Sequence, residues 1–116
     1  MERRFRLTSS IEIMRVRRSG QSFAHPLLVL VLDDGNKSNS KFAVTAGASI
    51  GNAVLRNRAK RLLRSALRDF LGNIEPGYYG VLIARKPLVR SNHRETKEAL
   101  GSLLNEAGII KSKTDG

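Results

Sequence analysis

The sequence predicts an α+β fold, a two-layer α/β sandwich in which helices pack on a small central sheet. Three segments repeat their apolar residues at helical spacing, three short apolar runs are typical of strands, and turn residues separate them. The order is helix, strand, strand, helix, strand, helix. A chain of 116 residues suits one core. We expect one domain, residues 1–110, and a flexible polar tail, residues 111–116.

The first helix is predicted in "SIEIMRVRRSG", residues 10–20. Thr8 or Ser9 can cap its start, because a hydroxyl oxygen accepts a hydrogen bond from a backbone N–H of the first turn. Gly20 can end it. The side chains expected to face the core are Ile11, Ile13 and Met14.

Two strands follow. The continuous apolar run in "PLLVLVLDD", residues 26–34, predicts a strand that is buried on both faces. Turn residues in "DGNKSNS", residues 34–40, predict a loop, and "KFAVTAGA", residues 41–48, predicts the second strand. Because the two strands are joined by a short loop, we expect them to form a hairpin.

The second helix is predicted over residues 52–71, with Gly72 following its last turn. At 100° per residue its side chains separate into two faces. The predicted buried face holds Leu55, Ala59, Leu62, Leu63, Ala66, Leu67 and Phe70. The opposite face holds Arg56, Lys60, Arg61, Arg64 and Arg68, with Arg58 at its edge.

This basic face indicates an anionic partner. A face that only contacts water usually mixes charge signs, whereas Arg56, Lys60 and Arg64 lie four residues apart and repel one another. Asp69 is the only nearby acid. Arginine is also suited to bidentate contacts with phosphate.

The remaining elements are a strand in "YYGVLIAR", residues 78–85, and a last helix that ends at Gly108. Asn92 and Glu95 are spaced as a capping box for that helix. The residues expected to face the core are Thr96, Ala99, Leu100, Leu103, Leu104 and Ala107.

The bulk composition favours nucleic acid as the partner. Twenty-one Lys and Arg against ten Asp and Glu give a net charge of +11. A membrane surface is the weaker alternative, because the chain has no Trp and its longest apolar run, residues 26–32, is too short to span a bilayer. No cysteine is present. We therefore expect a cytoplasmic protein without a membrane partner.

The sequence offers no recognisable catalytic or metal site of its own. His25 and His93 lack an evident catalytic companion, and the adjacent Asp33 and Asp34 more plausibly begin a turn than bind a metal. No glycine-rich phosphate loop is present, because Gly47 and Gly51 are not followed by the required Gly-Lys-Ser/Thr. We expect no catalytic residue and no metal ligand in the protein.

Residues 50–64, "IGNAVLRNRAKRLLR", resemble the protein subunit of bacterial ribonuclease P, whose signature is an Arg-Asn-Arg core followed by a basic helix. Here the core is Arg56, Asn57 and Arg58, and Lys60, Arg61 and Arg64 continue it. A second matching block is "IARKP", residues 83–87. The resemblance covers residues 3–107.

The resemblance implies that a large RNA holds the active site and that this chain is the accessory protein of the endoribonuclease, which removes the 5′ leader of precursor tRNA. It also implies a left-handed βαβ crossover and magnesium bound through the RNA. The basic helix would bind the catalytic RNA through Arg56, Asn57, Arg58, Lys60, Arg61, Arg64 and Arg68. A cleft between the sheet and the first helix would bind the leader, with candidates Ile13, Arg17, Val31, Arg85 and Lys86.

The sequence departs from the family pattern in two places. Aromatic residues that family members often place in the leader cleft are replaced by Ile13, Arg17 and Val31. Ala48 and Ser49 stand where the family often has two basic residues. Two other functions stay open at this point: a ribosome-associated or general RNA-binding module, and an autonomous protein nuclease.

Overall fold

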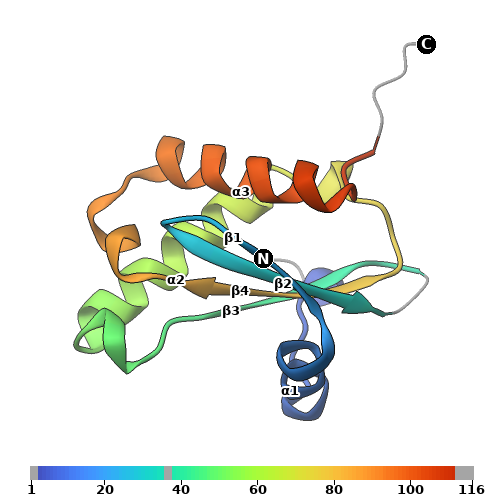
Figure 1. The fold of residues 1–116 in the computed structure, drawn as a ribbon, viewed down its shortest axis with the longest axis horizontal. Helices are drawn as coiled ribbons and strands as arrows, with labels where there is room; N and C mark the ends of the chain where they lie inside the picture. The colour runs from blue at the N-terminus through green and yellow to red at the C-terminus, as the bar shows by residue number, and fades with distance from the viewer. Residues whose placement is uncertain (1–2, 36–37, 112–116) are drawn as a thin grey trace.

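The structure is a computed structural model that describes residues 3–35 and 38–111. Figure 1 shows a sheet with α3 on one side and α1 on the other. The helices are α1 (Ser10–Ser19), α2 (Ala53–Arg68) and α3 (His93–Ala107). The strands are β1 (Gln21–Ala24), β2 (Leu28–Asp34), β3 (Lys41–Thr45) and β4 (Tyr78–Ala84). The predicted α+β class and the order of its six elements are confirmed, and the structure adds the short strand β1.

The strand order in the sheet is β1-β2-β4-β3. β2 pairs antiparallel with both β1 and β4, whereas β3 lies at the edge and pairs in parallel with β4. The predicted hairpin of residues 26–34 with residues 41–48 is therefore wrong. β2 forms its hairpin with β1, and β4 separates β2 from β3.

The larger core lies between the sheet and the layer formed by α2 and α3. Leu28, Leu30 and Leu32 alternate along β2 and are all buried in this core, as alternation in a strand requires. Phe42 of β3 and Leu63 of α2 are fully buried in the same cluster. The prediction that residues 26–34 contain a strand buried on both faces is confirmed, because Val31 is only 3% exposed on the other face.

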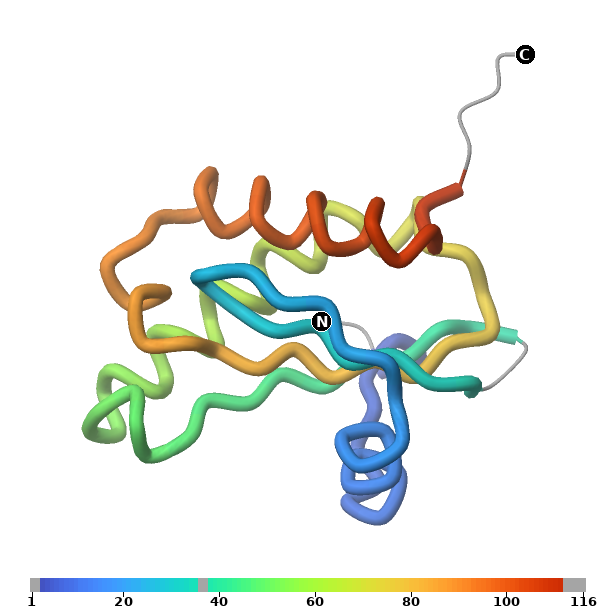
Figure 2. Tube along the Cα trace, in the orientation of Figure 1, coloured from blue at the N-terminus to red at the C-terminus, as the bar shows by residue number. Residues whose placement is uncertain are grey.

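α1 covers part of the second face of the sheet, and Figure 2 shows it projecting from that side of the domain. Val16 is completely buried there against Val31 and Val81, with Ile13 at the edge. The prediction for the inward face of α1 was wrong for Ile11 and Met14, which are 79% and 58% exposed. A ten-residue helix that covers only part of a sheet buries too few side chains to produce a full apolar stripe.

Asparagine and serine caps start the three helices. The side chains of Ser9, Asn52 and Asn92 each accept a hydrogen bond from the backbone N–H three residues later. Gly108 ends α3 in the left-handed conformation, as predicted. Gly72 was wrongly predicted to end the second helix: α2 ends at Arg68, and Gly72 lies within a separate 3-10 turn, Leu71–Asn73.

The chain after α3 pairs with the segment that precedes β4. The Glu75 N–H donates to the Ile109 carbonyl, and the Lys111 N–H donates to the Asn73 carbonyl. Lys111, which we placed in the polar tail, is therefore held by the domain. Residues 112–116 of that tail lie outside the described residues, as do Asn36 and Lys37 of the predicted loop.

Candidate nucleic-acid interface

The outermost row of α2 is basic and exposed. Four residues at spacings of four, three and four share this row: Asn57, Arg61, Arg64 and Arg68. None of the three arginines forms an ion pair with an acid within residues 3–35 and 38–111. These guanidinium groups are available to an anionic partner, and we call the four residues the outer row.

Arg58 lies on the flank of α2 and is fixed by backbone carbonyls. Its Nε donates to the Val89 carbonyl at 3.1 Å, and its Nη2 donates to the Ser91 carbonyl at 3.4 Å. These contacts join α2 to the turn that precedes α3. Arg58 therefore serves the fold as well as any partner, and its guanidinium is held in one orientation.

Arg56 and Lys60 lie on the other flank and are both half-buried. The Arg56 Nη1 donates to the Gly51 carbonyl at 2.7 Å, which ties the side chain to the turn before α2. The two arginines of the Arg-Asn-Arg core thus hold backbone carbonyls on opposite sides of the helix. Asn57, between them, points outward.

The start of α2 borders an apolar pocket with a basic rim. The pocket has a volume of about 680 Å³, and its lining consists of Ile50, Leu55, Arg58, Lys86, Pro87, Val89 and Arg90. Val54, beside it on the helix, is 73% exposed. Apolar walls with cations at the rim suit an unstacked base and its phosphates, which extends the basic surface beyond α2.

The two sequence blocks meet at this pocket. Arg58 comes from the Arg-Asn-Arg core, whereas Lys86 and Pro87 come from "IARKP". The structure brings them together because β4 ends beside the start of α2. No local pattern indicates that these blocks meet, because 28 positions separate Arg58 from Lys86.

The candidates for the leader cleft lie on the α1 side of the sheet or at its end. Arg17 is exposed on α1, and Ile13 packs at the edge of the small cluster beneath that helix. Val31 was a poor candidate, because α1 covers it and leaves it only 3% exposed. Val29, Tyr79 and Ile83 are the half-buried sheet side chains packed against the same cluster. The Tyr79 ring lies under the Arg15 guanidinium, whereas Val29 and Ile83 pair across β2 and β4. We regard these two as the accessible apolar floor.

Arg85 and Lys86 are exposed where β4 ends. They line a shallow pocket of about 470 Å³ together with Ala24, His25, Pro26 and Pro87. The Arg85 Nη1 contacts the His25 carbonyl at 3.4 Å. Lys86 lines this pocket and the larger one, so it lies between the end of the sheet and the basic helix.

One cation of α1 is neutralised within the protein. The Arg15 guanidinium contacts Glu12 at 2.7 Å and Asp33 at 2.8 Å, and it lies over the Tyr79 ring. The hydrogen bond to Glu12 and these nearby charges raise the pKa of Arg15. Arg17 and Arg18 of α1 are also exposed, and neither pairs with an acid in the described part of the chain.

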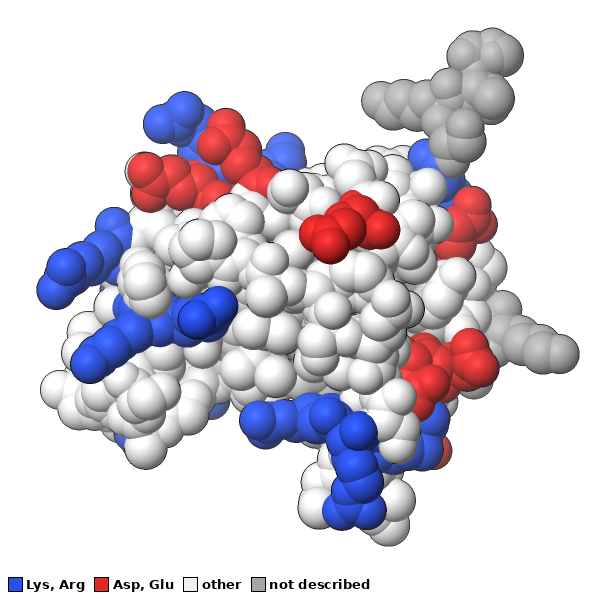
Figure 3. Space-filling view, viewed as in Figure 1, with Lys and Arg blue, Asp and Glu red and all other residues white. Residues whose placement is uncertain are grey.

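Figure 3 shows how charge is distributed over one face of the molecule. Lys and Arg gather around α1 and at the end where β4 leads towards α3, whereas acidic side chains lie along α3 and at the opposite end of the sheet. On this face the basic character is therefore local, around α1 and the end of β4.

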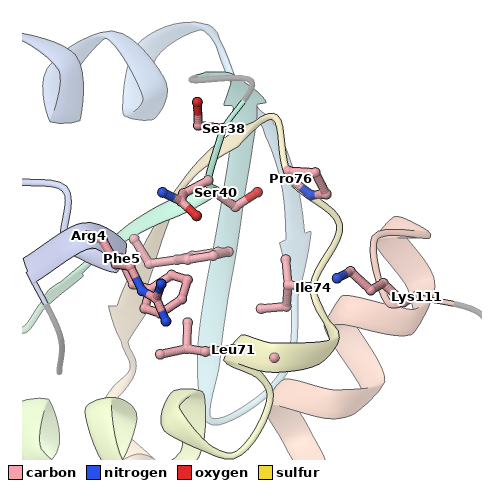
Figure 4. A pocket seen from close by; sticks show the side chains of 11 residues that line it. Arg4, Phe5, Ser38, Ser40, Leu71, Ile74, Pro76 and Lys111 are labelled. Carbon is pink, nitrogen blue, oxygen red and sulfur yellow. The ribbon is translucent and has the colours of Figure 1, made fainter.

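A further pocket, shown in Figure 4, lies beside the 3-10 turn that follows α2. It has a volume of about 220 Å³, and Phe5, Leu71 and Ile74 contribute apolar side chains to it. The Arg4 guanidinium lies 4.8 Å from the centre of the Phe5 ring. Because this guanidinium occupies a face of the ring, we do not include the pocket among the base-binding surfaces.

Among the residues that the structure describes, no group of three or more His, Asp or Glu side chains is placed to hold a metal ion. Within the same residues, no helix is long and apolar enough to cross a membrane.

Comparison with known proteins gives a consistent result. The ribonuclease P family model matches residues 1–108. The ribonuclease P protein component of Clostridium botulinum strain Eklund 17B is 35% identical over 119 residues, which cover 97% of this chain and 95% of that protein. The corresponding protein of Oceanobacillus iheyensis is 34% identical and is covered over 93% of its length, with 97% of this chain matched.

Solved structures agree with these relatives. The ribonuclease P protein from Thermotoga maritima has a TM-score of 0.77 at 26% identity, covering 87% of this chain and 96% of that one. For the Staphylococcus aureus protein the TM-score is 0.79 at 24% identity, with 92% and 98% covered, which supports the fold. The match over nearly the whole chain leads to one conclusion: this chain belongs to the ribonuclease P protein family, the protein component of the endoribonuclease that matures tRNA.

Proposed function

We propose that the chain docks on the catalytic RNA of ribonuclease P through α2. The single observation that supports this most directly is the outer row, in which Arg61, Arg64 and Arg68 are exposed and unpaired with acids in the described part of the chain. Each cation that contacts a phosphate releases counterions. For each such contact, the logarithm of the affinity falls by roughly 0.7 to 0.9 when the salt concentration rises tenfold. Arg56, Arg58 and Lys60 extend this surface on its two flanks.

The second part of the proposal concerns the substrate. We place the single-stranded 5′ leader of precursor tRNA between α1 and the sheet, with Arg17, Arg85 and Lys86 beside its phosphates. The floor of Ile13, Val29 and Ile83 is aliphatic, and the Tyr79 ring on the same face of the sheet already lies under the Arg15 guanidinium. Bases would therefore rest on apolar side chains without aromatic stacking, and such binding has little sequence preference.

Magnesium enters the proposal as a ligand of the RNA. The described acidic residues and histidines form no cluster that fits a resident ion, so we assign the protein no part in holding it. The ion would neutralise phosphates and take part in hydrolysis at the RNA active site. We also place the chain in the cytoplasm, in keeping with an absence of cysteine and a role in tRNA maturation.

The decisive experiment is cleavage of precursor tRNA at low magnesium and moderate salt. Three reactions are compared: a bacterial ribonuclease P RNA alone, the protein alone, and the two together. The proposal predicts efficient cleavage at the mature 5′ end only in the mixture. Cleavage by the protein alone would indicate a protein nuclease, and tight RNA binding without any stimulation would indicate a general RNA-binding module.

A further inference from the structure

A small notch lies at the seam between α2 and α3. Its volume is about 220 Å³, and it is lined by Arg58, Arg61, Leu62, Ser65 and His93. Arg61 also belongs to the outer row, so the notch opens beside the proposed RNA-binding surface. No acidic residue is among those that line it. We call these five residues the seam notch.

A chain of hydrogen bonds leads from the notch across the seam. The Ser65 Oγ lies 3.1 Å from the His93 Nδ1, and the His93 Nε2 lies 2.9 Å from the Asp69 Oδ2. The carboxylate can only accept, so the Nε2 of the ring carries a proton. In the neutral ring the Nδ1 is then an acceptor, and the Ser65 hydroxyl must donate its hydrogen to it.

Protonation of His93 reverses the bond to Ser65. Both ring nitrogens of an imidazolium are donors, so the Nδ1 donates to the Ser65 oxygen. The hydroxyl hydrogen is then free to donate to another acceptor, and the notch is the open space beside it. One proton on the ring therefore converts Ser65 into a donor for an anion in the notch.

The surrounding charges are compatible with this change. Arg58 and Arg61 face the notch from α2, whereas Asp69 lies on the other side of the ring with Lys97 of α3 at 3.6 Å from its Oδ2. The hydrogen bond from His93, with Lys97 nearby, lowers the pKa of Asp69 and keeps its carboxylate ionised. An imidazolium at position 93 is thus paired with the Asp69 carboxylate on one side. On the other side it shares the notch with Arg58 and Arg61, whose charges an anion would neutralise.

We propose that the seam notch binds a phosphodiester group of the RNA partner, with Arg61 and Ser65 as donors, and that binding places a proton on His93. The inference rests on the proposed docking of α2 on RNA and adds to it a site that includes α3. Because the phosphate favours the imidazolium, binding and protonation promote each other. The affinity for RNA should then decline as the pH rises, because a higher pH removes this proton.

The test measures the dissociation constant of the full chain with a bacterial ribonuclease P RNA from pH 5.8 to 8.2, at fixed magnesium and salt. Binding is measured because hydrolysis has a pH dependence of its own. We expect the affinity of the natural chain to fall about 5- to 10-fold over this range, at the lower end of typical coupling between sites. In His93→Gln this change should disappear, because glutamine does not titrate.

Three further variants make the result specific. Ser65→Ala removes the hydroxyl donor and should weaken binding mainly at low pH, which also flattens the profile. His25→Gln replaces the only other histidine and should keep the slope of the natural chain. Arg64 lies outside the notch, so Arg64→Ala should weaken binding by the same factor at every pH. A melting curve of each variant identifies loss of folding, and Ser65→Ala decides the question if His93→Gln is unstable.

The outcomes separate the two proposals. If Arg64→Ala binds RNA as tightly as the natural chain, then docking through α2 is itself wrong. If Arg64→Ala weakens binding but His93→Gln and Ser65→Ala keep the natural slope, then docking stands and the seam notch is overturned. A flat profile for the natural chain overturns it as well.

Discussion

At the scale of single residues, the arginines of α2 divide into those that hold the fold and those that face outward. Arg58 donates to the carbonyls of Val89 and Ser91, and Arg56 donates to that of Gly51. Arg64 makes no such contact within the described residues and is exposed. Arginines of equal charge therefore contribute differently to stability and to binding, and substitutions can separate the two contributions.

Arg64→Ala should weaken assembly with the catalytic RNA and leave the melting temperature almost unchanged, because its side chain contacts mainly water. The slope of log affinity against log salt concentration should also become shallower by roughly 0.7 to 0.9.

Arg58→Ala should weaken assembly and also cost about 1 kcal/mol of stability, because two carbonyls lose their donor. Binding titrations at several salt concentrations and thermal melts check both variants. Equal melting temperatures for the two would contradict the structural role of Arg58.

Neighbouring leucines of α2 make a second matched pair. Leu63 is completely buried, whereas Leu62 is half-buried at the seam notch. Leu63→Ala should cost about 2 to 5 kcal/mol, because it leaves a cavity in a packed core. Leu62→Ala should cost clearly less, since water already reaches it. Denaturant unfolding measures both, and a larger loss for Leu62→Ala would show that the buried face of α2 is misplaced.

The sequence prediction for the buried face of α2 can be judged from these residues. Ala59, Leu63, Ala66 and Leu67 are buried as predicted, because a long helix against a sheet produces a regular stripe. Leu62 is only half-buried, and Leu55 is 37% exposed because it borders the pocket at the start of the helix. Periodicity predicts which side of a helix faces the core. How deeply the residues at the border of that side are buried depends on packing against other elements, which the sequence of the helix does not show.

At the scale of elements, Asp69 links the end of α2 to α3. Its carboxylate accepts from His93 and lies near Lys97, and the first of these contacts chiefly lowers its pKa below the ordinary value of 3.8. A carboxyl group with a lowered pKa stabilises the folded chain above its unfolded value, and this contribution is lost as the pH falls through the folded value.

Asp69→Asn should therefore be less stable than the natural chain at pH values above 3.8, and the difference should shrink as the pH falls below 3.8. Unfolding by denaturant across this range measures the difference. Glu98→Gln on α3 is a suitable control, since Glu98 is exposed and forms no ion pair with another described residue. A stability difference that stays constant with pH would contradict the role of this carboxylate.

Strand pairing was harder to predict than helix position. β1 has the sequence "QSFA", with one half-buried residue among three exposed ones, and offers no apolar pattern. Without it, β2 had no evident hairpin partner except β3. β4 pairs with both β2 and β3, and pairing between strands so distant in the sequence leaves no local signal.

The candidate site shows the same limit. Arg61, Arg64 and Arg68 of the outer row could be predicted, because the helical period places them together on one helix. Arg56 and Lys60, which were predicted on the same exposed face, are half-buried on its flank. The contact of Ser65 with His93 joins residues 28 positions apart, and that of Arg58 with Val89 joins residues 31 apart. Val31 was misjudged because its cover, α1, was predicted with the wrong face towards the sheet. Such contacts between elements can be predicted only when the packing of the elements is known, and the apolar periodicity of the sequence does not determine that packing.

At the scale of the whole molecule, the proposed surfaces for the two RNAs belong to different elements. α2 carries the outer row, whereas α1 and the opposite face of the sheet carry the proposed leader site. Lys86 lies between them. The domain therefore joins two RNA contacts through one sheet, and loss of one contact should leave the other intact.

Arg17→Ala tests this separation. The assembled enzyme should lose affinity for precursor tRNA, by roughly 2- to 10-fold for one phosphate contact at moderate salt, and should bind mature tRNA as before. Arg64→Ala, assayed at saturating protein, should keep the natural preference for the precursor. Competition binding with precursor and mature tRNA measures both. An equal loss for the two tRNAs in Arg17→Ala would place Arg17 outside the leader site.

The central position of β4 has a consequence for synthesis of the chain. β2 and β3 both pair with β4 and not with each other, although both precede it in the sequence. While the ribosome is still translating the region of α2, the sheet consists of the β1–β2 hairpin, and β3 has no neighbour to pair with. α2 acquires its packing surface only when β4 enters between the older strands and α3 closes the core. We therefore expect the basic helix to complete its fold only after β4 and α3 have been synthesised, and productive assembly with RNA to follow that step.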